Sequence, residues 1–133
     1  MVIVDSDVWS EAFRKKNSRL RSVIALKKLI TKDEVVMIGP VRQEVLSGIK
    51  NSQQFERVKE VLRAFPSHVI DEPIFEMAAS CYNLCRRKGI QGTHTDFLIC
   101  ACSIRWKTSI LTNDRDFARY AKYVPIELYK YVK

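Results

Sequence analysis

Short apolar runs alternate along this chain with stretches in which apolar residues recur at helical spacing. Three runs, at residues 2–4, 35–38 and 109–111, are rich in Val, Ile and Leu and end in polar or turn residues, which predicts strands. Weaker runs at 68–70 and 126–129 predict two further short strands.

Between these runs, capping and turn residues stand where helical patterns begin. Ser18 can cap the second helix, Gly39 and Pro40 open the third, and Thr95 can cap an apolar helix from 96 to about 106. The predicted helices carry these apolar stripes: Val8, Trp9 and Phe13; Leu20, Val23, Ile24 and Ile30; Val41, Val45 and Ile49; Phe55, Val58, Leu62 and Phe65; and Ile74, Met77 and Ala78, within a long helix from 71 to about 89. Strands that alternate with helices predict an α/β sandwich with a mainly parallel sheet.

Length and composition place this pattern in one globular unit. A chain of 133 residues with 47% hydrophobic and 29% charged residues can bury one core, so we expect a single domain over 1–133. No apolar stretch approaches the roughly 20 residues that span a bilayer. The start of the chain shows no secretory signal pattern, so a cytoplasmic protein is expected.

The four cysteines do not have the arrangement of a zinc site. Cys81 and Cys85 fall on a helical core stripe, and Cys100 and Cys102 fall inside an apolar helix. Free buried thiols are expected instead of a metal site or disulfides.

Charge points to a polyanionic partner. The net charge is +8, and the basic residues are spread along the chain instead of forming a disordered tail. Nucleic acid is the commonest partner of such a surface, with an acidic protein or a membrane surface as alternatives.

Acidic residues stand at the ends of several predicted elements. Asp5 follows the first strand and Asp114 follows the 109–111 strand, so parallel strands would bring both to one sheet edge. Asp96 opens a helix whose body, 97–104, carries no charge, and Glu44 lies beside an apolar helical stripe. Each acid alone can be explained by helix capping, the helix dipole or solvation. Together, such carboxylates suit Mg²⁺ or Mn²⁺, which prefer oxygen ligands.

Four segments then resemble one known family. The order "IVDSDVW", "RQEVLSGI", "THTDFLICACS" and "ILTNDRDF" is similar to the PIN-domain ribonucleases, in particular the VapC-type toxins of prokaryotic toxin–antitoxin pairs. The resemblance implies a three-layer α/β/α sandwich. It also implies that Asp5, Glu44, Asp96 and Asp114 are catalytic acids, of which Asp5, Asp96 and Asp114 hold the metal. Auxiliary roles fall to Ser6, Thr112 and Asp116.

The same resemblance implies an activity and partners. It implies hydrolysis of RNA phosphodiester bonds with Mg²⁺, or Mn²⁺ as a substitute, leaving a 5′-phosphate and a 3′-hydroxyl. Basic residues around the cleft, including Arg115, would contact the RNA backbone. The implied partners are a cognate antitoxin, a second copy of the chain in a homodimer, and operator DNA only through the antitoxin complex. No membrane is implied.

Two residues near the predicted acids, Asp7 and His94, are not expected to take part in catalysis. Asp7 stands where the family usually has a small polar residue, and we expect it to face solvent, with a metal-ligand role as the alternative. His94 is expected to end a loop.

The sequence also leaves two other functions open. "DSDVW" resembles the opening of haloacid-dehalogenase-like phosphatases, with Asp5 as nucleophile and Asp7 as acid. A catalytically silent RNA-binding or antitoxin-titrating domain on the same fold is the other alternative.

Overall fold

Three short parallel strands form the centre of the structure, a computed structural model that describes residues 1–131. The strands are β1 (Val2–Val4), β2 (Val35–Val36) and β3 (Ser109–Leu111), in the order β2-β1-β3. The helices are α1 (Ser6–Arg14), α2 (Arg21–Thr31), α3 (Gly39–Ser47), α4 (Ser52–Leu62), α5 (Glu72–Arg87), α6 (His94–Trp106) and α7 (Asp116–Tyr120). The expected α/β class with a parallel sheet is confirmed.

The sheet is parallel because each connection between its strands is a helical crossover. β1 is central: it pairs with β2 through Val2 and Val35, and with β3 through Val4 and Leu111. All three residues of β1 are buried, as expected for a strand covered on both faces. The three strands therefore end at the same edge.

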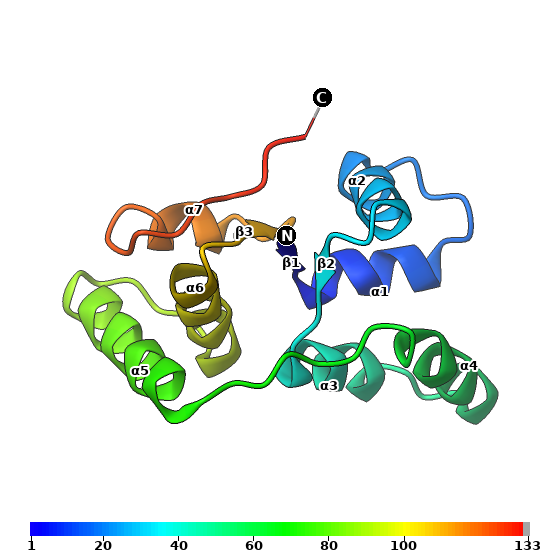
Figure 1. The fold of residues 1–133 in the computed structure, drawn as a ribbon, viewed down its shortest axis with the longest axis horizontal. Helices are drawn as coiled ribbons and strands as arrows, with labels where there is room; N and C mark the ends of the chain where they lie inside the picture. The colour runs from blue at the N-terminus through cyan, green and yellow to red at the C-terminus, as the bar shows by residue number, and fades with distance from the viewer. Residues whose placement is uncertain (132–133) are drawn as a thin grey trace.

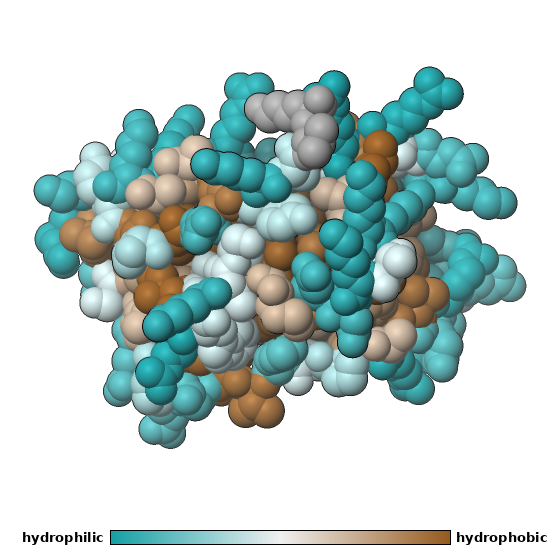
Figure 2. Space-filling view, turned by 45° about the horizontal axis from the view of Figure 1, so that its top comes forward, coloured by the Kyte–Doolittle hydropathy of each residue, from teal (hydrophilic) through white to brown (hydrophobic). Residues whose placement is uncertain are grey.

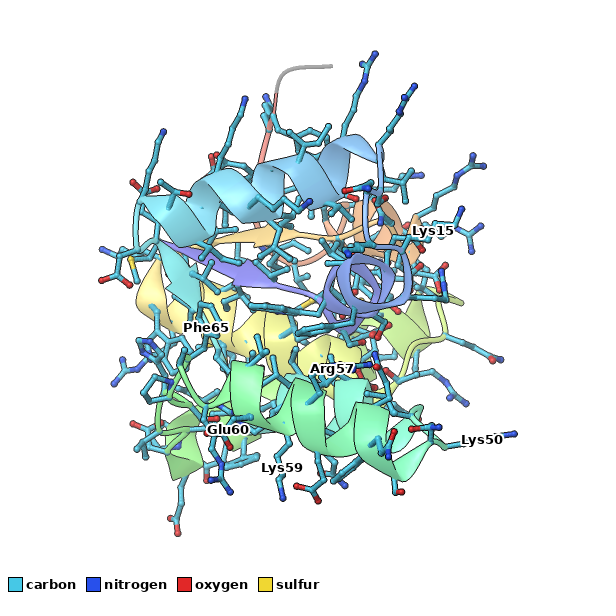
Figure 3. The ribbon with its side chains drawn as sticks, turned by 90° about the vertical axis from the view of Figure 1, so that its right-hand side faces the viewer. Lys15, Lys50, Arg57, Lys59, Glu60 and Phe65 are labelled. Carbon is cyan, nitrogen blue, oxygen red and sulfur yellow. The ribbon has the colours of Figure 1, made fainter. Side chains whose placement is uncertain are left out.

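Helices cover both faces of this sheet (Figures 1 and 3). In Figure 3, α2 lies above the strands, and α6 and α4 lie below them. The layers are those of the expected three-layer sandwich. Within residues 1–131, no helix is both long enough and apolar enough to cross a membrane.

The apolar helix α6 is the central packing element on its side of the sheet. Every residue from 97 to 103 is buried, and the helix packs along α5 and against β3. All four cysteines are free and buried, two in α5 and two in α6, as predicted. The buried body of α6 therefore positions its first turn, which carries Asp96.

The two weak strand predictions, 68–70 and 126–129, are wrong as strands. A single parallel bridge is found near each segment instead: Ser67, one residue before the first run, pairs with Met37, and Leu128 in the second run pairs with Ile110. After the bridge at Ser67 the chain turns away from the sheet, and Val69 is 87% exposed. β2 is likewise shorter than the predicted 35–38 run, because pairing with β1 stops at Val36.

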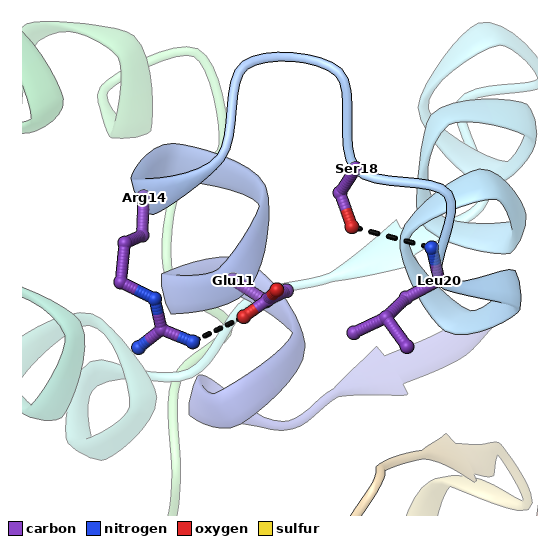
Figure 4. Close-up of polar contacts among 4 residues, drawn as sticks. All are labelled: Glu11, Arg14, Ser18 and Leu20. Carbon is purple, nitrogen blue, oxygen red and sulfur yellow. Dashed lines mark hydrogen bonds and ion pairs between the residues drawn. The ribbon is translucent and has the colours of Figure 1, made fainter.

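Two predicted helix caps are displaced. Ser18 does not cap α2; its hydroxyl accepts a hydrogen bond from the Leu20 N–H, and α2 begins at Arg21 (Figure 4). Thr95 does not cap α6, because Thr93 accepts from the Asp96 N–H at 3.0 Å and starts the helix earlier.

Candidate active site

The carboxyl ends of β1 and β3 bring two distant segments together. The Asp5 N–H donates to the Leu111 carbonyl at 2.9 Å, which continues the strand pairing one residue beyond β1. Asp5 therefore lies directly beside Thr112, the residue that follows β3. This edge is where open parallel sheets place functional groups.

Asp5 is the most deeply buried acid, with 5% of its surface exposed. One carboxylate oxygen accepts from the Ser6 N–H at 2.8 Å, and the other accepts from the Thr112 hydroxyl at 2.7 Å. Burial raises the pKa of Asp5 to about 7; the charges of Asp7 and Asp96 add to this, and the two hydrogen bonds oppose it. Asp5 thus caps α1 and also faces other acids.

The turn after β3 is built by its own polar side chains. The Thr112 hydroxyl accepts from the Asp114 N–H at 3.0 Å, and Asp114 Oδ1 accepts from the Asp116 N–H at 2.9 Å. The Asp116 carboxylate lies 3.5 Å from Arg119 within α7. Asp114 is therefore fixed at the site, whereas the Asp116 side chain pairs along its own helix.

Asp96 reaches the same place from the first turn of α6. The Tyr120 hydroxyl donates to Asp96 Oδ2 at 2.6 Å. Burial raises the pKa of Asp96, the hydrogen bonds from Tyr120 and Thr93 oppose the shift, and the charges of Asp114 and Glu44 add to it. The negative charges of these acids therefore raise the pKa of Asp96, as expected if the acids lie at one site.

Glu44 stands at the rim of this site on α3. Its side chain is exposed, and its Oε1 accepts from the Ser6 hydroxyl at 2.9 Å. Ser6 therefore links two acids, since its N–H is bonded to Asp5 and its hydroxyl to Glu44. The structure brings together all four acids that the sequence predicts, with Ser6 and Thr112 between them.

Comparison with known proteins gives this arrangement a family. The PIN domain family matches residues 2–123. The chain belongs to the PIN domain family. Membership decides against the dehalogenase-like phosphatase, and the predicted resemblance is confirmed.

Two similar relatives of this chain are named as ribonucleases. The chain is 29% identical over 121 residues to Ribonuclease VapC11 of Mycobacterium tuberculosis and to VapC ribonuclease Mb1587 of Mycobacterium bovis. Each match covers 88% of this chain and 89% of the relative. The chain is therefore a homologue of the VapC ribonucleases of toxin–antitoxin systems.

Solved structures share the PIN fold of this chain. FitAcB from Neisseria gonorrhoeae superimposes with a TM-score of 0.77 at 21% identity, covering 98% of this chain and 97% of that one. VapBC2 from Rickettsia felis, bound to a promoter DNA fragment, has a TM-score of 0.77 at 17% identity, covering 99% and 100%.

The expectation that Asp7 faces solvent is wrong. Its Oδ2 accepts from the Asn113 N–H at 3.1 Å, and its Oδ1 is buried without a hydrogen-bond partner among the described residues. Burial raises the pKa of Asp7, the N–H groups of Asn113 and Val8 oppose this, and the charges of Asp114 and Asp96 add to it. Asp7 is a fifth acid at this PIN-domain site.

Two other sequence expectations have different outcomes. Arg115 is exposed at the start of α7, next to Asp114, and its contact with RNA stays a prediction. His94 does not end a loop; it lies in the first turn of α6, and its ring stacks on Tyr82 with centroids 4.9 Å apart.

The donor chemistry of the site fits a hard divalent cation. The candidate ligands are carboxylates, of which Asp5 is buried among like charges, and the Asp7 Oδ1 atom lacks a hydrogen-bond partner among the described residues. Among the described residues, no group of three or more His, Cys, Asp or Glu side chains is placed so that it could hold a metal ion. That is compatible with Mg²⁺, which keeps several waters and takes only one or two direct carboxylates.

Tyr120 and Gly92 are site residues that the sequence did not reveal. Tyr120 is completely buried, yet its hydroxyl reaches Asp96. A Cβ on Gly92 would lie 2.4 Å from that hydroxyl and 2.7 Å from the Phe97 ring. Gly92 therefore leaves the space in which Tyr120 can hold Asp96.

We expect Tyr120→Phe to lower the free energy of unfolding by about 1.5–3 kcal/mol in the absence of metal. The ring packing is kept, and the loss is that of a hydrogen bond to a carboxylate. Urea denaturation measures it, with Tyr123→Phe as the control because Tyr123 is 40% exposed. In a double-mutant cycle with Asp96→Ala, additive effects would contradict the predicted coupling.

Proposed function

We propose that this PIN domain is a Mg²⁺-dependent endoribonuclease, with Mn²⁺ as a substitute, and the toxin of a type II toxin–antitoxin pair. The observation that carries the proposal is the meeting of Asp5, Asp96 and Asp114 at one sheet edge. Support comes from VapC ribonucleases that match 88% of the chain.

Each acid has a separate task in this proposal. Asp5, Asp96 and Asp114 would hold the cation. When bound, Mg²⁺ neutralises charge on the scissile phosphate and lowers the pKa of a water molecule. Glu44 is the acid most open to solvent, and the Ser6 hydroxyl orients its carboxylate, so it is suited to accept the proton of the attacking water.

The proposed partners follow from the same relatives. A VapBC2 structure contains a DNA fragment from its promoter, and a FitAB structure contains an IR36 DNA fragment. We propose by analogy that this chain works in the cytoplasm as a homodimer held inactive by a cognate antitoxin, and that it reaches operator DNA only through that complex.

A cleavage assay with defined single-stranded RNA tests the proposal. The purified chain should cut RNA in millimolar Mg²⁺ and stop when a chelator is added. Products should carry 5′-phosphates. RNA binding without any cleavage in Mg²⁺ or Mn²⁺ would favour the catalytically silent alternative.

Basic side chains offer the RNA backbone a binding surface. Long hydrophilic side chains project over the face in Figure 2, and Lys15, Lys50 and Lys59 point outward in Figure 3. Not all of them are free: Lys59 pairs with Glu56 at 2.7 Å. Arg115 is exposed beside the acids, where a phosphate would enter.

We expect RNA binding to weaken steeply with salt and to depend on Arg115. In an Asp96→Asn background that cannot cleave, Arg115→Ala should reduce the slope of log affinity against log salt by about 0.7, one phosphate contact. Lys59→Ala is the matched control, because its charge is already paired. Fluorescence anisotropy between 50 and 200 mM salt measures both. Equal slopes in all proteins would contradict the role of Arg115.

A further inference from the structure

The excess positive charge of the chain lies in one segment. Basic residues occur along the whole sequence, but residues 14–32 hold eight Lys or Arg residues and no Asp or Glu. The rest of the chain holds fifteen residues of each sign, so this segment alone carries the net charge of +8. Most of it is α2 and the turn that leads into α2. This concentration of one sign favours a polyanionic ligand at α2.

A groove lies between α2 and the C-terminal segment 129–131, which rises beside α2 in Figure 1. Arg21, Lys28 and Lys32 line it from one face of α2, and Lys130 lines it from the C-terminal segment. All four side chains are exposed, and no acidic residue lines the groove. None of the four takes part in an ion pair within residues 1–131. Their charges are therefore available to a ligand.

Two tyrosine rings lie in the same groove. Tyr129 and Tyr131 are half-buried, with ring centroids 6.5 Å apart and ring planes inclined by 24°. The Tyr129 N–H donates to the Ile110 carbonyl at 2.7 Å, which holds this segment against β3. Aromatic rings beside cations suit single-stranded nucleic acid, because bases stack on the rings and phosphates lie on the cations. An anionic membrane surface would use the cations and not the rings.

The direction of α2 connects the groove with the acids. The Val2 N–H donates to the Glu34 carbonyl, so the chain just after α2 lies beside the start of β1. Figure 3 shows α2 lying lengthwise over the strands, and a helix of 11 residues is about 16 Å long. Arg21, in its first turn, therefore lies toward the opposite edge of the sheet, where β1 ends at Asp5. A strand that follows the groove from Lys32 to Arg21 points toward the acidic edge.

We propose that the groove between α2 and residues 129–131 binds a single-stranded part of the RNA substrate at a distance from the cleaved bond. Its four cations contact phosphates, and its two tyrosine rings stack with bases. The inference rests on the proposed function, which supplies RNA as the ligand. It goes beyond that function because it assigns a second contact surface outside the acidic edge.

Removing two charges from the groove tests the phosphate contacts. In the Asp96→Asn background, Lys28→Gln with Lys32→Gln should reduce the slope of log affinity against log salt by about 1.4, or about 0.7 for each lost contact. Fluorescence anisotropy with a labelled single-stranded RNA between about 50 and 200 mM salt measures the slope. Lys59→Gln with Arg63→Gln is the matched control. It removes the same charge from α4, where both side chains are already paired with glutamates, so its slope should stay parental.

Replacing one ring tests the stacking. In the same background, Tyr131→Leu should weaken binding of the single-stranded RNA by at least about fivefold, because it removes the flat surface on which a base stacks. Tyr131→Phe keeps the ring and should restore the affinity. Thermal melts show whether each variant is folded. Should Tyr131→Leu fail to fold, the slopes of the two charge variants decide.

The outcomes separate this inference from the proposed function. Equal slopes in the two charge variants would overturn the groove, and the proposed nuclease would stand if the parent cleaves RNA in Mg²⁺. The expected losses in a chain whose parent never cleaves would support the groove and overturn the nuclease. A reduced slope with parental affinity in folded Tyr131→Leu would overturn the binding of unpaired bases. Phosphatidylserine vesicles whose binding depends on Lys28 and Lys32, with RNA binding unchanged, would assign the groove to a membrane surface and overturn the inference.

Discussion

Asp96→Asn should leave the protein folded and reduce Mg²⁺-dependent RNA cleavage by at least about a hundredfold. The amide keeps the shape and can still accept from the Tyr120 hydroxyl, but it removes one charge from the proposed cation site. A bound metal supplies several kcal/mol of charge stabilisation in the transition state, and each 1.36 kcal/mol is a factor of ten in rate. Single-turnover cleavage of a defined RNA measures the loss.

The same assay compares the other acids. Asp5→Asn and Asp114→Asn should lose as much activity as Asp96→Asn, and Asp33→Asn should keep parental activity because it makes the same chemical change at an exposed turn. Full activity in Asp96→Asn would remove Asp96 from the catalytic set.

Without divalent cations, the protein should be more stable at pH 5 than at pH 8. The pKa of Asp5 is 3.8 in an unfolded chain and about 7 in the fold. Between these values the folded state binds more protons, so the free energy of unfolding falls as pH rises through this window. From pH 5 to pH 8 about two units of this window are crossed, which corresponds to about 3 kcal/mol, or on the order of 10 °C in melting temperature.

Asp5→Asn isolates this contribution. The variant lacks the titrating carboxyl, so its melting temperature in a chelator should vary less between pH 5 and pH 8. Mg²⁺ at about 100 times its Kd should add roughly 2.7 kcal/mol to the parent at pH 8, and little to the variant. Identical pH dependence in the two proteins would contradict the buried, proton-binding state of Asp5.

The sequence predicts the scaffold of the site well because strand ends and apolar helices are local patterns. Three Val- and Ile-rich runs mark the strands, and parallel pairing then requires Asp5 and Asp114 to meet. The uncharged body of α6 correctly indicates a buried helix that carries Asp96 inward. The weak runs at 68–70 and 126–129 fail because one bridge with a neighbour does not extend into a ladder.

What the sequence does not predict depends on contacts between distant segments. Asp7 resembles a solvated helix start until Asn113 and Asp114 are placed against it. Tyr120 has the spacing of a core residue in α7, and only the fold shows that its hydroxyl ends on Asp96. By residue type, Thr93 and Thr95 are equally good N-caps for α6. Thr93 is the cap in the structure because its hydroxyl oxygen accepts from the Asp96 N–H.

The contact between Asp5 and Thr112 can form only late in synthesis of the chain, because the two residues are far apart in the sequence. Thr112 lies 107 positions after Asp5, and β1, the central strand, receives β3 as its last partner along the chain. At about 5–20 residues per second, a ribosome needs roughly 5 to 20 seconds to make the intervening chain. Throughout that interval Asp5 has neither Thr112 nor Asp114 beside it. The proposed nuclease site is therefore incomplete until residue 114 has been made.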